Sequence, residues 1–296
     1  MSSDSYFEYL MREIFSKSYL DGLDLKLSKN KEYKPKGPLT KSLFDTFPEM
    51  FAVLECVGKC MWMTYLGRNQ VSMEFSPTEY ARHVYTMCFF MKRIMKDVYD
   101  AFCSTLSLVI WVAELIYVAS GRNFYKLTPL IFTEFFESAL REDFDKRGGW
   151  MPLERHIISK KYNEYYDKLA ASNFCIDENV AITVEEIVMS QTTSDFSCVP
   201  GEEMEMNEQK AAELSRKVIL SIGTSLLNEI SSVVLEKYSI SKQTKGSDSG
   251  EANGNNYELE DTNAMDYFQI DIGNLIGELE EKARQLILIF ELLDAK

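Results

Sequence analysis

The chain has few of the residues on which catalytic sites depend. Its 296 residues include only two histidines, which are His83 and His156. The sequence contains no glycine-rich phosphate loop, no Cys-x-x-Cys pair, no His-Glu-x-x-His helix and no Gly-x-Ser-x-Gly turn. A single histidine on a helix is more often a partnered structural residue than a base. We therefore expect a protein that is not an enzyme and that uses no cofactor or metal ion.

The marks of a secreted protein are also missing. The six cysteines follow no spacing typical of a disulfide framework, and no Asn-x-Ser/Thr sequon occurs. The first residues do not form a basic and then apolar leader. The sequence therefore predicts a reducing, cytoplasmic location.

Charge is divided unevenly between the two halves of the chain. Residues 1–150 contain 19 Lys or Arg and 19 Asp or Glu, whereas residues 151–296 contain 13 and 27, so the net charge of −14 lies in the second half. An acidic surface repels nucleic-acid phosphates and anionic lipids. We therefore expect neither nucleic acid nor an anionic lipid surface as a partner of the second half.

One long apolar run, residues 101–120, could be read as a membrane span. Its length reaches the spanning threshold, and only one charge, Glu114, interrupts it. Ser104, Thr105 and Ser107 lie within the run, and a basic flank is missing on one side, which favours a buried helix. We predict a central core helix and no integral membrane span.

Apolar residues recur at helical spacing along most of the chain, and cap residues mark where several helices begin. Asp4 is a good first cap, Ser76-Pro77-Thr78-Glu79 is a capping box, and Thr128-Pro129 opens a later helix. The predicted helices cover residues 4–15, 48–67, 77–98, 101–121, 128–147, 152–169, 207–238 and 271–293. The fold class that follows is all-α, a helical bundle around a buried apolar central helix.

The second half is predicted to be a helical extension of this bundle. Residues 173–206 are less regular and include a β-like run at 180–184, whereas 241–264 are rich in Ser, Gly and Asn and are expected to be flexible. The predicted organisation is a bundle at 1–170, an acidic helical extension at 171–240, a linker at 241–264 and an amphipathic helix at 265–296.

The most specific local signal is Gly148-Gly149-Trp150 at the end of the amphipathic stretch 133–147. Only glycine enters a left-handed helix cap at no steric cost, and an indole ring needs a packed site. We interpret these residues as a built junction that ends one helix and anchors the next segment.

Residues 133–150 resemble the second homology motif of the Bcl family of apoptosis regulators, whose helix ends in a Gly-Gly-Trp junction. Trp111, followed ten residues later by Gly121, is similar to the first homology motif on the buried central helix of that fold. The helix that begins near Tyr6 occupies the place of the N-terminal helix of the family. One departure is that Val112 and Ala113 stand where the family has Gly-Arg.

This resemblance covers about residues 4–170 and implies a regulator of apoptosis that acts by protein contact. A partner would insert an amphipathic helix into an apolar groove, with anchors at i, i+3 or i+4, and i+7. Each candidate groove residue could instead be ordinary core. The candidates are Phe90, Met91, Met95, Val98, Phe102, Val109, Trp111 and Leu115, and the motif residues are Gly121, Gly148, Gly149 and Trp150.

Two other classes of protein stay open. A viral or parasite structural or scaffold protein would use such helices for self-assembly, so an oligomer is possible, and a helical enzyme with a site that no motif reveals is the third class. A free apolar groove next to Trp111 would favour the helix binder. Closed packing there, with an exposed apolar stripe on 207–238 or 271–293, would favour assembly.

Overall fold

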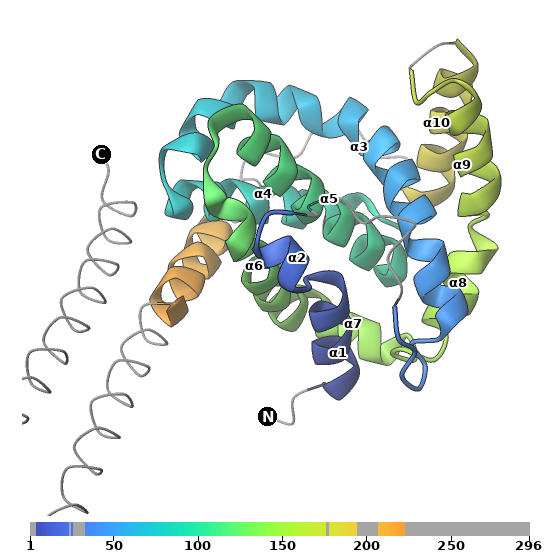
Figure 1. Ribbon diagram of the computed structural model, residues 1–296, viewed down its shortest axis with the longest axis horizontal. Helices are drawn as coiled ribbons and strands as arrows, with labels where there is room; N and C mark the ends of the chain where they lie inside the picture. Colours follow the sequence, from blue (N-terminus) through green and yellow to red (C-terminus); the bar gives the residue numbers. More distant parts are fainter. Residues whose placement is uncertain (1–3, 24, 26–32, 176–177, 194–206, 223–296) are drawn as a thin grey trace, which may run out of the picture. The chain divides into compact units, whose positions relative to one another are not determined.

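The structure is a computed structural model that describes residues 4–23, 25, 33–175, 178–193 and 207–222 (Figure 1). The chain divides into two compact units, Met1–Val218 and Ile219–Lys296, and the first unit is described below. This unit extends past residue 170. The predicted linker at 241–264 and the predicted helix at 265–296 lie outside the described residues.

Every regular element in the described residues is a helix, which confirms the all-α fold class. Residues 207–222 are helical as well, as predicted for the start of 207–238. The elements are α1 (Ser5–Ile14), α2 (Lys17–Leu20), α3 (Lys41–Phe75), α4 (Pro77–Ile94), α5 (Val98–Ser120), η1 (Asn123–Leu127), α6 (Thr128–Phe135), η2 (Phe136–Leu140), α7 (Arg141–Lys146), α8 (Leu153–Ser159), α9 (Tyr162–Ala171) and α10 (Glu178–Gln191).

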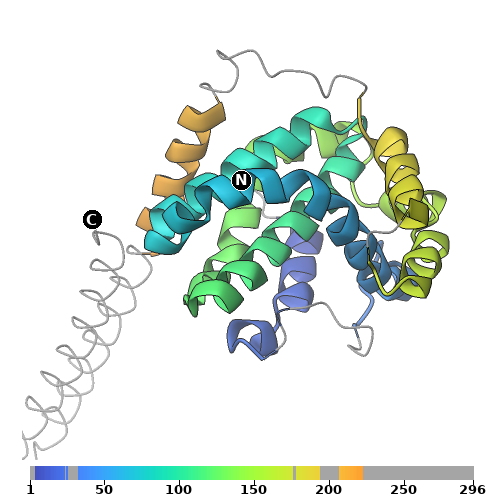
Figure 2. The same ribbon diagram turned by 90° about the horizontal axis from the view of Figure 1, so that it is seen from above.

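The apolar helix α5 is the centre of the bundle, as the sequence predicts. It contacts α3, α4, η1 and α6, and Figures 1 and 2 show it enclosed by these helices. By length and composition α5 could cross a membrane, but 78% of its most apolar window is buried inside the fold. Trp111 is 6% exposed, and Gly121 ends the helix in the left-handed conformation at φ 70°.

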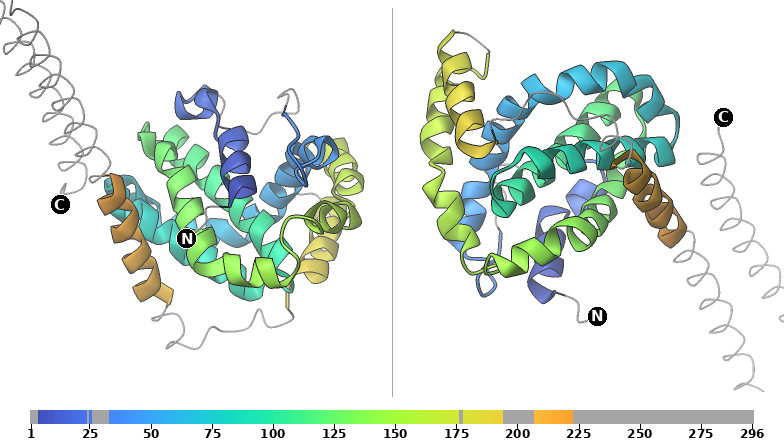
Figure 3. Two further views of the ribbon diagram at one scale, coloured as in Figure 1. Left: turned by 90° about the horizontal axis from the view of Figure 1, so that it is seen from below. Right: turned by 180° about the vertical axis from the view of Figure 1, so that it is seen from behind.

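The helices α9 and α10 flank one end of the long helix α3. Contacts join α3 to α9, α10 to α9 and α10 to α3, and the three lie side by side in the view from behind (Figure 3). The predicted β-like run at 180–184 is wrong, because these residues belong to α10. Val180, Thr183, Val184, Ile187 and Gln191 form one buried helical face, and this packing overrides the β propensity of the run.

One predicted helix start is wrong, and one predicted helix cap is wrong. The predicted start at Pro48 fails because α3 begins at Lys41, where the Thr40 side chain accepts the backbone N–H of Leu43. Pro48 therefore lies inside the helix. Thr128 is the first residue of α6 rather than its cap, since the 3₁₀ helix η1 leads directly into it.

The predicted end of this helix near Gly67 is also wrong. The helix continues to Phe75, although an interior glycine costs about 1 kcal/mol relative to alanine. Leu66 and Met73, on either side of the glycine, are buried. Burial of such side chains outweighs the cost of one glycine.

The predicted third and sixth helices are each interrupted once. α4 ends at Ile94 rather than at Val98, because Met95 is extended and bridges to Thr192 while Asp97 caps α5. The predicted helix 152–169 is split into α8 and α9 at Lys161, which has φ 56°.

Candidate functional site

The Gly148-Gly149-Trp150 junction forms the motif that its sequence predicts. The backbone N–H of Gly149 donates to the Phe144 carbonyl at 2.9 Å, and that of Gly148 donates to the Asp145 carbonyl at 3.0 Å. These two bonds are the pair that defines a Schellman cap. Both glycines have positive φ, at 114° and 64°. The two glycines therefore end the helix and form the predicted junction.

Trp150 fixes this junction to the N-terminus of the chain. Its indole N–H donates to Asp4 Oδ2 at 2.7 Å, and Arg141 donates to the same oxygen at 2.9 Å. Asp4 Oδ1 accepts the backbone N–H groups of Tyr6 and Phe7, so one carboxylate serves as helix cap and as tryptophan partner. The ring contacts a cluster of aromatic side chains, which are Phe7, Phe102, Phe136 and Phe144.

The start of α5 ties the same region to the helices that follow. The Tyr99 hydroxyl donates to the Gly149 carbonyl at 2.7 Å, and the Arg147 side chain donates to Asp97 at 3.0 Å. The carboxylate of Asp100 is 1% exposed and lies 2.8 Å from His156 Nε2 and 2.6 Å from Lys160 Nζ. These groups are all partnered, so the region anchors the fold and offers no open site.

The structure places the eight candidate groove residues in different surroundings. Phe102 and Val109 are fully buried, and Met91, Met95 and Trp111 are at most 9% exposed. Val98 and Leu115 are partly exposed, and neither lines either of the two pockets described below. Of the eight, Phe90 alone lines one of the two pockets described below. A role for the set in partner binding stays a prediction.

The pocket that Phe90 lines lies between α3 and α4 and is named here the α3–α4 pocket. Its volume is about 480 Å³, and its apolar wall includes Trp62, Met87 and Phe90. The Trp62 ring packs on Trp111 with centroids 5.3 Å apart. One aromatic ring therefore separates this pocket from the central helix at Trp111.

The polar wall of the α3–α4 pocket is built around His83. Tyr65 Oη lies 2.8 Å from His83 Nδ1, and Arg82 Nη2 lies 3.3 Å from Nε2. Because arginine can only donate, Nε2 accepts and the ring proton is on Nδ1. Burial, assisted by the positive charge of Arg82 and opposed by Glu79, lowers the pKa of His83. The imidazole is therefore neutral near pH 7 and acts as a structural link.

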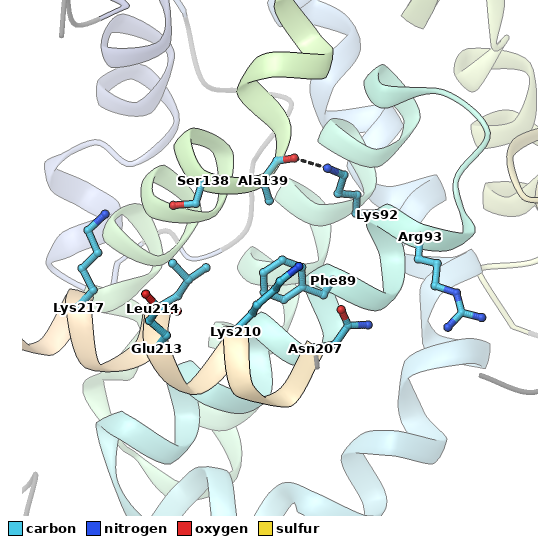
Figure 4. A pocket seen from close by; sticks show the side chains of 10 residues that line it. All are labelled: Phe89, Lys92, Arg93, Ser138, Ala139, Asn207, Lys210, Glu213, Leu214 and Lys217. Carbon is cyan, nitrogen blue, oxygen red and sulfur yellow. Dashed lines mark hydrogen bonds between the residues drawn. The ribbon is translucent and has the colours of Figure 1, made fainter. Parts of the chain in front are cut away.

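A second pocket, named here the α4–η2 pocket, lies between α4, η2 and residues 207–217. Its volume is about 600 Å³. In Figure 4 the Phe89 ring lies between the wall at Ala139 and the helix that carries Lys210 and Leu214. Lys92 donates to the Ala139 carbonyl across this pocket.

Residues 207–218 form an amphipathic helix that packs beside both pockets. Its buried residues are Ala211, Leu214, Ser215 and Val218, at spacings of 3, 4 and 7 from the first. Lys217 pairs with Glu134, and Asn207 lines both pockets. In this part of the chain the apolar face is covered, rather than exposed as the assembly hypothesis expects.

The described residues hold no cluster of three or more His, Cys, Asp or Glu that could bind a metal ion. Burial raises the pKa of the Cys88 and Cys103 thiols, which disfavours the reactive thiolate form.

Comparison with known proteins gives no match, whether with protein-family models, with curated proteins or with solved structures.

Sequence reasoning did not find the pocket residues Arg68, Arg82 and Phe89. They come from α3 and α4. Their neighbours across the α3–α4 pocket are Asn207 and Glu208, and those across the α4–η2 pocket come from η2 and from residues 207–217. The one available signal was the spacing of Ala211, Leu214, Ser215 and Val218, which predicts a helix with a buried face.

Proposed function

We propose that this protein is a Bcl-like helical bundle that binds an amphipathic helix of a partner protein and regulates apoptosis without catalysis. The observation that carries the proposal is the packing of residues 207–218. This segment buries residues at positions 0, 3, 4 and 7, which is the spacing that helix-in-groove recognition uses. A partner helix of that kind would take the place of residues 207–218 on this surface of α4 and its neighbours.

The order of elements supports the comparison with the Bcl family. An N-terminal amphipathic helix packs through Phe7 on the aromatic cluster, an apolar helix is central, and a Gly-Gly-Trp junction follows the next long helical segment. Val112 and Ala113, which replace the Gly-Arg pair of the family, are 0% and 1% exposed. A partner carboxylate therefore needs a different cation in this chain.

Titration calorimetry with the full chain tests the proposal. An amphipathic peptide with apolar residues at positions 0, 3, 4 and 7 should bind, and the same peptide with glutamate at two of these positions should not. Phe90→Ala should weaken binding of the apolar peptide by about tenfold, or about 1.4 kcal/mol, because Phe90 lines the α3–α4 pocket.

Ile158→Ala is the control, since Ile158 is an apolar residue of α8 that is 54% exposed and lies outside both pockets. Its affinity should stay within about twofold of the natural chain. If no such peptide binds a chain shown to be folded, the groove proposal fails. Concentration-dependent assembly in sedimentation would then favour the scaffold alternative.

A further inference from the structure

The α3–α4 pocket has more positive than negative charge along its lining. Arg68 from α3 and Arg82 and Arg93 from α4 all line it, and Glu208 is the one acidic residue among the lining residues. Trp62 supplies part of its apolar wall. A pocket of this kind suits a carboxylate that enters together with an apolar body.

Arg68 and Arg82 differ in their partners. Arg82 is held by Glu79, which accepts from its Nε at 3.0 Å and from its Nη2 at 2.5 Å. Arg68 is exposed and makes no ion pair with another described residue. One guanidinium is therefore fixed in place, whereas the other can turn toward an incoming anion.

The chain itself brings a carboxylate to this pocket. Glu208 lies in the first turn of the 207–222 helix, three residues before the buried Ala211. It lines the pocket together with Tyr65 and Arg82. Burial raises the pKa of Tyr65 and the hydrogen bond to Glu79 raises that of Arg82, and the negative charge of Glu208 adds to both effects. An acidic residue one turn before the first apolar anchor therefore reaches the polar wall of the pocket.

We propose that Arg68 and Arg82 form a carboxylate site, and that it receives an acidic side chain located one turn before the first anchor of the partner helix. The inference rests on the proposed function, because it names a specificity determinant of the same surface. Glu208 occupies the rim of the site in the free chain and competes with the partner.

Calorimetric titration of the full chain with two peptides tests this site. The peptides share apolar anchors at positions 0, 3, 4 and 7 and differ only at position −3, which is Asp in one and Asn in the other. Arg68→Gln should weaken binding of the Asp peptide about threefold to tenfold and leave the Asn peptide unchanged. Glu208→Gln should tighten binding of the Asp peptide, because it removes the competing carboxylate.

Arg122→Gln is the control, since Arg122 is an exposed arginine at the start of η1 and lies outside both pockets. It should change the affinity for neither peptide. An equal response of the Asp and Asn peptides to Arg68→Gln would overturn the carboxylate site while leaving helix binding intact. If neither peptide binds the natural chain or Glu208→Gln, the proposed function fails and this inference fails with it.

Discussion

The 148–150 junction and the α3–α4 pocket use their polar groups in opposite ways. At the junction, Asp4 accepts from two side chains and two backbone groups, and Trp150 is 7% exposed. At the pocket, Arg68 is exposed and Tyr65 is partly exposed beside a volume of about 480 Å³. The first region is complete within one chain, whereas the second has room for another molecule.

This difference separates the region that the sequence motif marks from the pocket at which we propose that a partner binds. The Gly-Gly-Trp motif is specific because a left-handed cap and a buried indole restrict which residues fit. The pocket is lined by residues of α3 and α4 and by Asn207 and Glu208, which are far apart in the sequence and therefore form no local motif. A strong local signal in this chain indicates a structural anchor.

The largest expected effect is at the junction. Trp150→Ala should lower the free energy of unfolding by about 3–5 kcal/mol, because it removes a buried ring and leaves Asp4 without one donor. Met151→Ala, at a residue that is 76% exposed, should change it by less than about 0.5 kcal/mol. Urea unfolding followed by circular dichroism measures both. Equal losses in the two variants would contradict the assigned anchor.

A smaller effect is expected from the glycine cap. Gly148→Ala should cost about 1–3 kcal/mol, because φ is 114° and the new Cβ would lie 2.9 Å from Pro152 Cγ. Gly121→Ala meets no atom within 4 Å at φ 70°, so it should cost only about 1 kcal/mol. Thermal unfolding of both variants compares backbone strain alone, in Gly121→Ala, with backbone strain plus a steric contact, in Gly148→Ala. A larger loss of stability in Gly121→Ala than in Gly148→Ala would contradict this interpretation.

The smallest effect is expected from His83 in the pocket wall. Its pKa is lowered in the folded state from 6.5, so the unfolded chain binds more protons below that pH. Stability should therefore fall as the pH drops below about 6.5, with a contribution of up to about 1 kcal/mol per pH unit. His83→Gln should flatten the decline between about pH 6.5 and 5.5. Parallel stability curves for the two proteins would rule this contribution out.

Local signals predicted the parts of the fold that local chemistry determines. The Asp4 cap, the Ser76 cap and the left-handed Gly148 all depend on a few adjacent residues. The errors occurred where distant packing decides the outcome. Pro48 lies inside α3, and the β-branched run at 180–184 is helical because its buried face packs with α3 and α9.

The site was less predictable than the fold, for a geometric reason. Helical spacing predicted that Phe90 and Trp111 lie on apolar helix faces. Spacing alone does not say which of these faces packs against a neighbouring helix and which lines a pocket. Arg68 and Arg82 lie 14 positions apart on two helices and line one pocket because α3 and α4 pack together. Only the tertiary arrangement reveals that pairing.

The wide turn η2 has a further consequence for the aromatic cluster. Phe132, Phe136, Leu140 and Phe144 are buried and follow one another every four residues, a spacing that drifts by about 40° per step around a regular helix. By Phe144 the drift would reach about 120° and turn that ring away from Trp150. The backbone N–H of Arg141 donates to the Phe136 carbonyl, five residues earlier. This wider turn accommodates one extra residue and offsets most of the angular drift of the later side chains around the helix. The π-type turn thus brings the buried rings on its two sides close to one face of the helix.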